Sequence, residues 1–179
     1  IFAESVLGIK NPRVGLLNIG EEEGKGNAQA KATYDLLKEQ KDINFVGNVE
    51  SSYIFTGKYC DVVVADGFVG NVILKMAEAM YRINNRLTPF KPWLLNLLRP
   101  VLEPMCPKLY YHQNFWNAMN YESVGGTIVI GVNAPVMIGH GGSSAKAICS
   151  LICTMERNIE SRVCDKLREA FKDVTPVEE

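Results

Sequence analysis

Three glycine-rich loops in this sequence each separate a run of apolar residues from the helical pattern that follows it. The loops cover residues 20–27, 66–71 and 139–144. Apolar, β-branched runs that end abruptly are typical of strands buried on both faces of a parallel sheet. Because such runs alternate with helical patterns, we expect one α/β domain over residues 1–179, built on a doubly wound, mostly parallel sheet.

The spacing of the apolar residues predicts where the elements lie. Strands are expected at residues 14–20, 43–49, 61–66, 127–132 and 135–139. Helices are expected at residues 28–40, 71–87 and 145–171, with a short helix or turn at 51–56. The second of these helices carries one apolar face, formed by Val72, Met76, Ala79, Met80 and Ile83. Binding sites of open α/β sheets lie at the carboxyl ends of the strands, so we expect the three loops to line one cleft.

Residues 88–120 interrupt this alternation. Repeated prolines punctuate a segment rich in leucine, tryptophan and tyrosine. We expect a helical excursion that caps the core or forms a dimer contact. The alternative is a patch that touches a membrane or a lipid-bearing partner, because the apolar piece 93–98 is flanked by Lys91 and Arg99.

Several classes of protein find no support in the composition or the motifs. A net charge of −1 gives no electrostatic case for binding nucleic acid. No apolar stretch reaches the ~20 residues that a membrane-spanning helix needs. The five cysteines form no CxxC pair, so we expect no metal cluster. The motifs of P-loop proteins, serine hydrolases and zinc proteases are absent as well.

The loop at 139–144 has the chemistry of an anion site. It reads His140-Gly141-Gly142-Ser143-Ser144 and leads directly into a helix. A helix N-terminus presents unpaired N–H groups and a positive dipole end, and glycines let a ligand approach the backbone. We expect Gly141, Gly142, Ser143 and Ser144 to bind phosphate. His140 either acts as a general acid or as a donor to phosphate, or has a structural role.

The other two loops supply further candidates. Lys25 lies between two glycines in an acidic loop, where its ammonium either binds a phosphate oxygen or is simply solvated. Asn71 either donates its amide to an oxyanion or caps the helix that follows it. Asp66 binds a donor, positions a base or shapes the turn that also contains Gly67 and Gly70.

Five segments, in this order, carry a resemblance to a known family. They are NPRVGLLNIGEE at 11–22, KGN at 25–27, FVGNVE at 45–50, ADGFVGNV at 65–72, and GVNAP at 131–135 leading into His140-Gly141. Together they resemble the phosphate acyltransferases of bacterial phospholipid synthesis (PlsX). The Asp-x-x-Gly-Gly-Asp motif with which that family opens has no counterpart here, and the sequence starts without methionine. We therefore expect this chain to be a fragment that resembles the carboxyl-terminal half of the family.

The resemblance implies an activity and a setting. The activity is transfer of a fatty acyl group from acyl-carrier protein to inorganic phosphate, which gives acyl phosphate without a metal or redox cofactor. The implied fold is similar to that of isocitrate and isopropylmalate dehydrogenases, in a homodimer, with a helical hairpin at 88–120 that is associated with membrane contact. The implied location is the cytoplasm, with peripheral contact at the inner face of the membrane.

Residue roles follow as hypotheses. The proposed catalytic residues are Lys25, Asn71 and His140, and the residues proposed to contact substrate are Asp66, Gly67 and Gly70. One rival reading is a phosphate acetyltransferase or a decarboxylating dehydrogenase of related fold, although the dehydrogenase needs a metal-binding aspartate cluster and no DxxxD repeat is evident. Another is a non-catalytic module in which residues 88–120 dock a partner or a bilayer.

Overall fold

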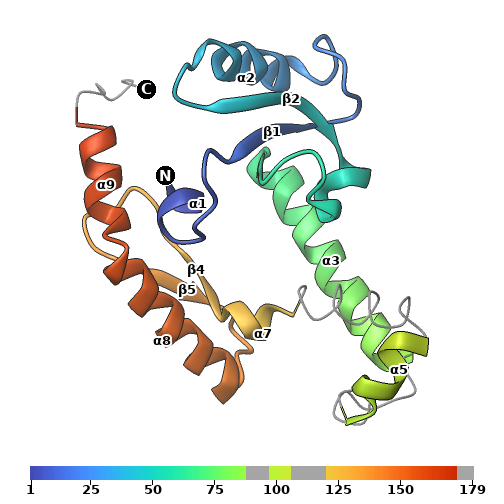
Figure 1. Cartoon of the computed structure of the whole chain (residues 1–179). Coiled ribbons are helices and arrows are strands. Elements are labelled where there is room, and N and C mark those ends of the chain that lie inside the picture. The colour runs from blue at the N-terminus through green and yellow to red at the C-terminus, as the bar shows by residue number, and fades with distance from the viewer. Residues whose placement is uncertain (88–96, 106–119, 173–179) are drawn as a thin grey trace. The chain divides into compact units, whose positions relative to one another are not determined.

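We analysed a computed structural model of the chain, which describes residues 1–87, 97–105 and 120–172 (Figure 1). The chain divides into two compact units. The first unit contains Ile1–Val69, Val129–Val136 and Met155–Glu179. The second unit contains Gly70–Ile128 and Met137–Thr154.

A three-stranded parallel sheet forms the centre of the first unit. Its strands are β1 (Arg13–Asn18), β2 (Asn44–Glu50) and β3 (Val62–Val64), in the order β2-β1-β3. The short helix α1 (Phe2–Ser5) precedes the sheet, α2 (Ala28–Glu39) crosses from β1 to β2 and packs on both, and the 3₁₀ helix η1 (Ser51–Thr56) follows β2. This parallel sheet with its crossover helix confirms the predicted α/β class, and each strand lies within one residue of its predicted start.

A bulge interrupts the pairing of β1 with β2. Val14 lies opposite Phe45, but the next residue of β1, Gly15, lies opposite Gly47. Val46 is therefore an extra residue, and Gly47 adopts a φ of 92°, which glycine tolerates without strain. A bulge of this kind re-aims the side chains around it.

An ion pair joins the start of β1 to the residue before β3. The Arg13 side chain donates to both oxygens of Asp61, at 3.0 and 2.9 Å, and to the carbonyls of Gly57 and Lys58. The Arg13 backbone N–H donates to Asp61 as well, at 2.9 Å. These hydrogen bonds, the side-chain one first, lower the pKa of the Asp61 carboxyl from 3.8 to about 2.

We expect Asp61 to make the free energy of unfolding of the first unit depend on pH in the acid range. Because its folded pKa lies below its unfolded pKa, its contribution is present above about pH 4 and is lost as the pH falls towards 2. In the variant Asp61→Asn, the free energy of unfolding by urea should change less with pH across that window than in the wild type. In Asp42→Asn, at an exposed aspartate just before β2, the change with pH should be the same as in the wild type. An Asp61→Asn protein with the wild-type slope would contradict this assignment.

Helix α3 (Gly67–Leu87) begins four residues before its predicted start. Asp66 caps it, because one carboxylate oxygen accepts the N–H groups of Phe68 at 2.8 Å and Val69 at 3.1 Å. An aspartate in front of a helix satisfies unpaired N–H groups and complements the dipole, which explains the earlier start. The predicted loop at 66–71 and the capping reading of Asn71 are therefore wrong, since Gly67, Gly70 and Asn71 are helical.

The apolar face predicted for α3 is exposed in the described part of the chain. Val72, Met76, Met80 and Ile83 keep 50, 63, 47 and 56% of their surface exposed. Of the predicted excursion, the structure describes the region of α5 (Arg99–Met105), while residues 88–96 and 106–119 lie outside the described residues. Among the described helices, none combines the length and the apolarity that crossing a bilayer requires.

The second unit contains a short antiparallel sheet. It follows α7 (Tyr121–Val124) and consists of β4 (Gly126–Ile128) and β5 (Met137–Gly139). The sequence predicted strands at 127–132 and 135–139 as part of a mostly parallel sheet. Both strands form and are shorter than predicted, but they make a separate antiparallel sheet, so their expected place in the parallel sheet is wrong. The connection between them is too short for a parallel crossover, so the strands pair as a hairpin. Beyond the two strands, the backbone pairing of the hairpin includes a hydrogen bond from the Val129 N–H to the Val136 carbonyl at 2.8 Å.

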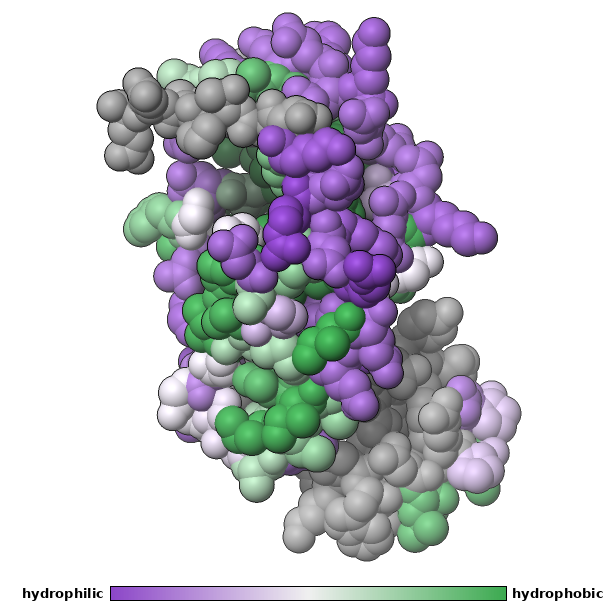
Figure 2. All heavy atoms as spheres, turned by 90° about the vertical axis from the view of Figure 1, so that its left-hand side faces the viewer, coloured by the Kyte–Doolittle hydropathy of each residue, from purple (hydrophilic) through white to green (hydrophobic). Residues whose placement is uncertain are grey.

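The predicted closing helix at 145–171 is two helices, α8 (Ala145–Glu160) and α9 (Val163–Ala170). The break falls at Arg162, which adopts a left-handed conformation with a φ of 53°. On α8, Ile148 and Ile152 remain 45 and 61% exposed. Hydrophobic surface is visible on the side of the molecule that carries this helix (Figure 2).

Gly125 allows α8 to lie directly against the chain that enters β4. A Cβ atom on Gly125 would lie 2.2 Å from the backbone nitrogen of Leu151 and 2.5 Å from the carbonyl oxygen of Ala147. Gly125 also has a φ of 81°. Glycine is therefore required at this position both by the backbone conformation and by the close packing of α8.

Candidate functional site

Two buried asparagines hold the loop at 20–27 against the carboxyl end of the sheet. Asn18, the last residue of β1, donates from Nδ2 to the Asn48 side-chain oxygen and to the Lys25 carbonyl, both at 3.0 Å. Asn48, near the end of β2, donates from its own Nδ2 to the Glu22 carbonyl at 2.7 Å. The two residues are 9 and 6% exposed, so the bond between their amides is shielded from water. The loop therefore has a defined shape around Lys25.

Gly26 and Asn27 join this loop to helix α2. A Cβ on Gly26 would lie 2.6 Å from Oδ1 of Asn18, and Gly26 has a φ of 92°. The Asn27 side chain caps α2 by accepting the Ala30 N–H at 2.8 Å. Lys25 consequently lies two residues before the cap of a helix, where the dipole is positive.

Glu23 ties the same loop to the body of α2. Its carboxylate accepts hydrogen bonds from the Tyr34 hydroxyl at 3.1 Å and from the Lys38 ammonium at 2.8 Å. The bond from Lys38 first, and then that from Tyr34, lowers the pKa of Glu23. Sequence reasoning assigned chemistry only to Lys25 and missed the loop's attachment. The missed signal was an asparagine near the end of each of two consecutive strands.

The Lys25 ammonium is available to an anion. Its Nζ lies 3.8 Å from a carboxylate oxygen of Glu22, and the Lys25 side chain is 48% exposed. An exposed pair at that distance contributes little, so a dianion can replace Glu22 at the ammonium. Together with the N-terminus of α2, this arrangement is suited to binding phosphate.

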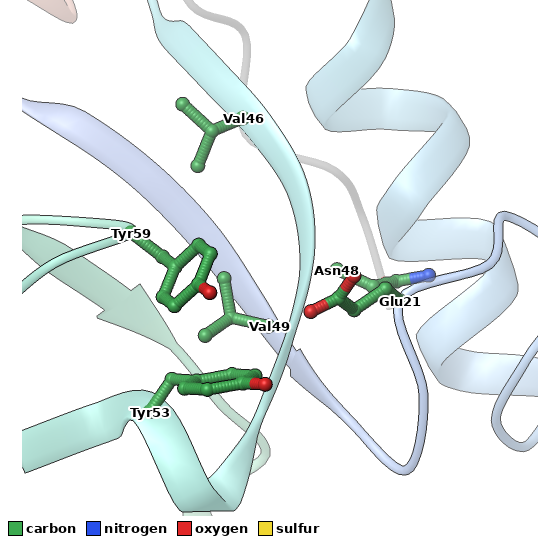
Figure 3. Close-up of a pocket in the computed structure, with 6 residues that line it drawn as sticks. All are labelled: Glu21, Val46, Asn48, Val49, Tyr53 and Tyr59. Carbon is green, nitrogen blue, oxygen red and sulfur yellow. The ribbon is translucent and has the colours of Figure 1, made fainter.

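A pocket of about 280 Å³ lies beside this loop (Figure 3), and sequence reasoning missed it. It is lined by Glu21, Val46, Asn48, Val49, Tyr53 and Tyr59. The two tyrosine rings contact each other in a tilted arrangement, with their centroids 4.3 Å apart and their planes at 47°. Glu21 follows β1 and Tyr53 follows β2, so the pocket reaches the carboxyl end of the sheet, where α/β proteins bind ligands.

In the second unit, the loop at 139–144 is closed by its own hydrogen bonds. The backbone N–H and the hydroxyl of Ser143 both donate to the His140 carbonyl, at 3.0 and 2.7 Å. The Gly142 N–H donates to Nδ1 of His140 at 3.1 Å. Because Nδ1 accepts a hydrogen bond, this geometry assigns the proton of a neutral His140 ring to Nε2.

Ser144 caps helix α8 and is held by a residue that the sequence did not single out. Its hydroxyl oxygen accepts the Ala147 N–H at 3.2 Å, and its hydroxyl donates to a carboxylate oxygen of Glu122 at 2.7 Å. Glu122 belongs to α7, far away in sequence, so no local pattern indicated this contact. Because the N–H groups of Gly142 and Ser143 and the hydroxyls of Ser143 and Ser144 already bond within the protein, an anion at this loop would be bound by the other backbone N–H groups that lead into α8.

The candidate residues divide between the two units. Lys25, Asp66 and Gly67 belong to the first unit, and Gly70, Asn71 and the loop at 139–144 belong to the second. The expectation that they line one cleft stays a prediction. The described residues contain no group of three or more histidine, cysteine, aspartate or glutamate side chains placed to hold a metal ion.

Comparison with known proteins gives consistent similarities. The family model described as "Fatty acid synthesis protein" matches residues 1–166. A phosphate acyltransferase of Nitratidesulfovibrio vulgaris is 40% identical over 170 residues, which are 95% of this chain and 48% of that protein. Phosphate acyltransferases of Clostridium perfringens and Desulfitobacterium hafniense are 42 and 38% identical, over 94 and 100% of this chain and 49 and 52% of their own lengths. The chain thus spans about half the length of these curated relatives.

Proposed function

Because this chain belongs to the fatty acid synthesis protein family, we propose that it moves a fatty acyl group from acyl-carrier protein to inorganic phosphate. A phosphate oxygen attacks the thioester carbonyl carbon, the carbon–sulfur bond breaks, and the carrier leaves as a thiolate. The product is acyl phosphate, which serves phospholipid synthesis. The names of the relatives support the acyl transfer and the phosphate.

The observation that carries this proposal is the ordered loop around Lys25. The Lys25 side chain is 48% exposed, and the residue shortly precedes the N-terminus of α2. Its backbone is held there because its carbonyl accepts a hydrogen bond from Asn18. An enzyme of this type has to bind a dianion, orient it for attack and stabilise a tetrahedral oxyanion. In the proposed mechanism Lys25 binds phosphate and balances the charge that develops on it.

The second unit completes the proposed site. The backbone of the loop at 139–144, which includes Gly141 and Gly142, contacts phosphate, and His140 donates from Nε2. Asn71, whose side chain is exposed on the second turn of α3, faces the thioester oxygen. The turn at Asp66 borders the acyl donor.

We propose a wider setting on the same basis. The fold is similar to that of isocitrate and isopropylmalate dehydrogenases, and the protein acts in the cytoplasm as a homodimer. The exposed apolar face of α3 supports association with another chain. Residues 88–120 make the proposed peripheral contact with the inner face of the membrane.

The test is formation of acyl phosphate by the protein expressed from its complete reading frame. Purified protein is mixed with acyl-carrier-protein thioester and inorganic phosphate, and acyl phosphate is trapped with hydroxylamine. Lys25→Ala is expected to raise the KM for phosphate about tenfold, because it removes one charge-assisted hydrogen bond. His140→Ala is expected to lower kcat by a similar factor.

Lys31→Ala is the matched control, because Lys31 is an exposed lysine on α2 outside the proposed site. It should leave both constants unchanged. If Lys25→Ala and His140→Ala both form acyl phosphate within about a factor of two of the wild type, these roles are wrong.

A further inference from the structure

We propose that the pocket lined by Val46, Val49, Tyr53 and Tyr59 binds the uncharged, thioester-bearing arm of the acyl donor, while phosphate binds at Lys25. This inference rests on the proposed function. It assigns phosphate to Lys25 in the loop at 20–27 and the acyl donor to the neighbouring pocket beside β2. The division follows from the chemistry of the lining.

The bulge in β2 gives the pocket its apolar wall. Without an extra residue, Val46 and Val49 would point to opposite faces of the strand. The bulge at Val46 and Gly47 changes this alternation, and both valines lie on the side of β2 that faces Tyr59 (Figure 3). Val46 is 41% exposed, so a ligand can reach this wall from solvent.

The polar groups of the pocket do not favour an anion. Glu21 places a carboxylate at its edge, and the Asn48 amide is already bonded to Asn18 and Glu22. The pKa of the Tyr53 hydroxyl is raised, first by its neighbour Tyr59 and further by the charges of Glu21 and Glu50. A second negative charge would be repelled here, whereas an uncharged chain would contact two aromatic rings and two valines.

The size of the pocket limits what it can hold. Its volume of about 280 Å³ is just below the range of ~300–1,000 Å³ that is typical of small-molecule sites. It therefore accommodates a short segment next to the thioester rather than a complete fatty acyl chain with its carrier. The thioester would then lie in the pocket near Glu21, and phosphate would approach it from Lys25, which belongs to the same loop as Glu21.

Three probes of equal chain length separate the possible ligand chemistries. They are the octanoyl thioester of N-acetylcysteamine, which is neutral, octanoate, which is anionic, and octylammonium, which is cationic. Binding is measured by calorimetry with the protein expressed from its complete reading frame. We expect the thioester to bind at least about tenfold more tightly than octanoate. Equal binding of these two, or tighter binding of octylammonium than of the thioester, would overturn the proposal.

Two variants localise the binding. Val46→Trp fills the pocket from its exposed edge and should weaken thioester binding about tenfold or more, while Leu36→Trp, at a 62% exposed position on α2, should leave it unchanged. Glu21→Gln removes the charge without adding bulk and should strengthen octanoate binding only, so it tests the pocket even if Val46→Trp does not fold. Octanoate binding that Glu21→Gln leaves unchanged, or thioester binding that a folded Val46→Trp leaves unchanged, would overturn the assignment.

Failure of the proposed function gives a different result. If the wild-type protein binds the thioester but forms no acyl phosphate, and Val46→Trp does not bind the thioester, the pocket assignment stands and the proposed reaction is wrong. If the wild-type protein forms acyl phosphate and the KM for the acyl donor is unchanged in Val46→Trp, the proposed reaction stands and the pocket assignment is wrong.

Discussion

The variant Gly125→Ala is expected to lower the free energy of unfolding of the second unit by about 3 kcal/mol or more. Two penalties combine at this residue. An alanine would hold a left-handed φ of 81°, and its Cβ would lie 2.2 Å from the backbone nitrogen of Leu151. Because the obstacle is helix backbone rather than a flexible side chain, α8 itself must move away from β4.

Gly131→Ala separates the two penalties. Gly131 has a φ of 91°, but nothing lies within 4 Å of the position of its Cβ. It should therefore cost only the ~1–2 kcal/mol of the left-handed conformation. Urea unfolding measures both variants, and hydrogen exchange of the α8 amides shows where Gly125→Ala acts. Equal losses in the two variants would show that α8 does not lie close to Gly125.

The variant Asn48→Leu is expected to cost about 2 kcal/mol of stability and to raise the KM for phosphate more than tenfold. Leucine has a similar size but leaves the Glu22 carbonyl and one Asn18 bond without a partner. The loop then loses its attachment to β2, and Lys25 loses its fixed position. Trypsin, which cleaves after lysine, should cut the Lys25–Gly26 bond several times faster than in the wild type.

Asn44→Leu is the control at the other end of the same strand. Its amide donates to the Asn11 carbonyl, at 3.2 Å, and not to the loop around Lys25 in the part of the chain that the structure describes. Cleavage at Lys25 and the KM for phosphate should both remain at their wild-type values in this control. An Asn48→Leu protein that is folded and equally resistant to trypsin would show that the asparagine pair does not order the loop.

The parallel sheet was predictable because its signal is local. The runs that became β1, β2 and β3 are rich in apolar residues, and a helix or a helical turn follows each of them in the chain. The function of Asn18 and Asn48 was not predictable in the same way. Asn18 ends β1 and Asn48 lies near the end of β2, which are common places for a polar residue, and only the parallel pairing of the two strands brings the amides together.

Some residues have a structural role that the sequence could not separate from a role in binding. Asp66 was expected to bind a donor, to position a base or to shape the turn, and its carboxylate caps α3, which moves the start of the helix to Gly67. Ser143 and Ser144 were expected to bind phosphate, and in the structure the Ser144 hydroxyl donates to Glu122. Local patterns identify the residue types that such roles require, but the competing partner comes from a distant part of the chain.

The extra residue in β2 makes the length of this strand a strict requirement. Deleting Val46 would restore an unbroken ladder with β1, but one flank of the strand would have to turn over. Either Phe45 would leave its edge-on contact with Tyr34, or the Asn48 amide would turn away from Asn18. A single-codon deletion here would therefore be more damaging than most substitutions, and gene variants that differ in length should change in the surrounding loops rather than within this strand.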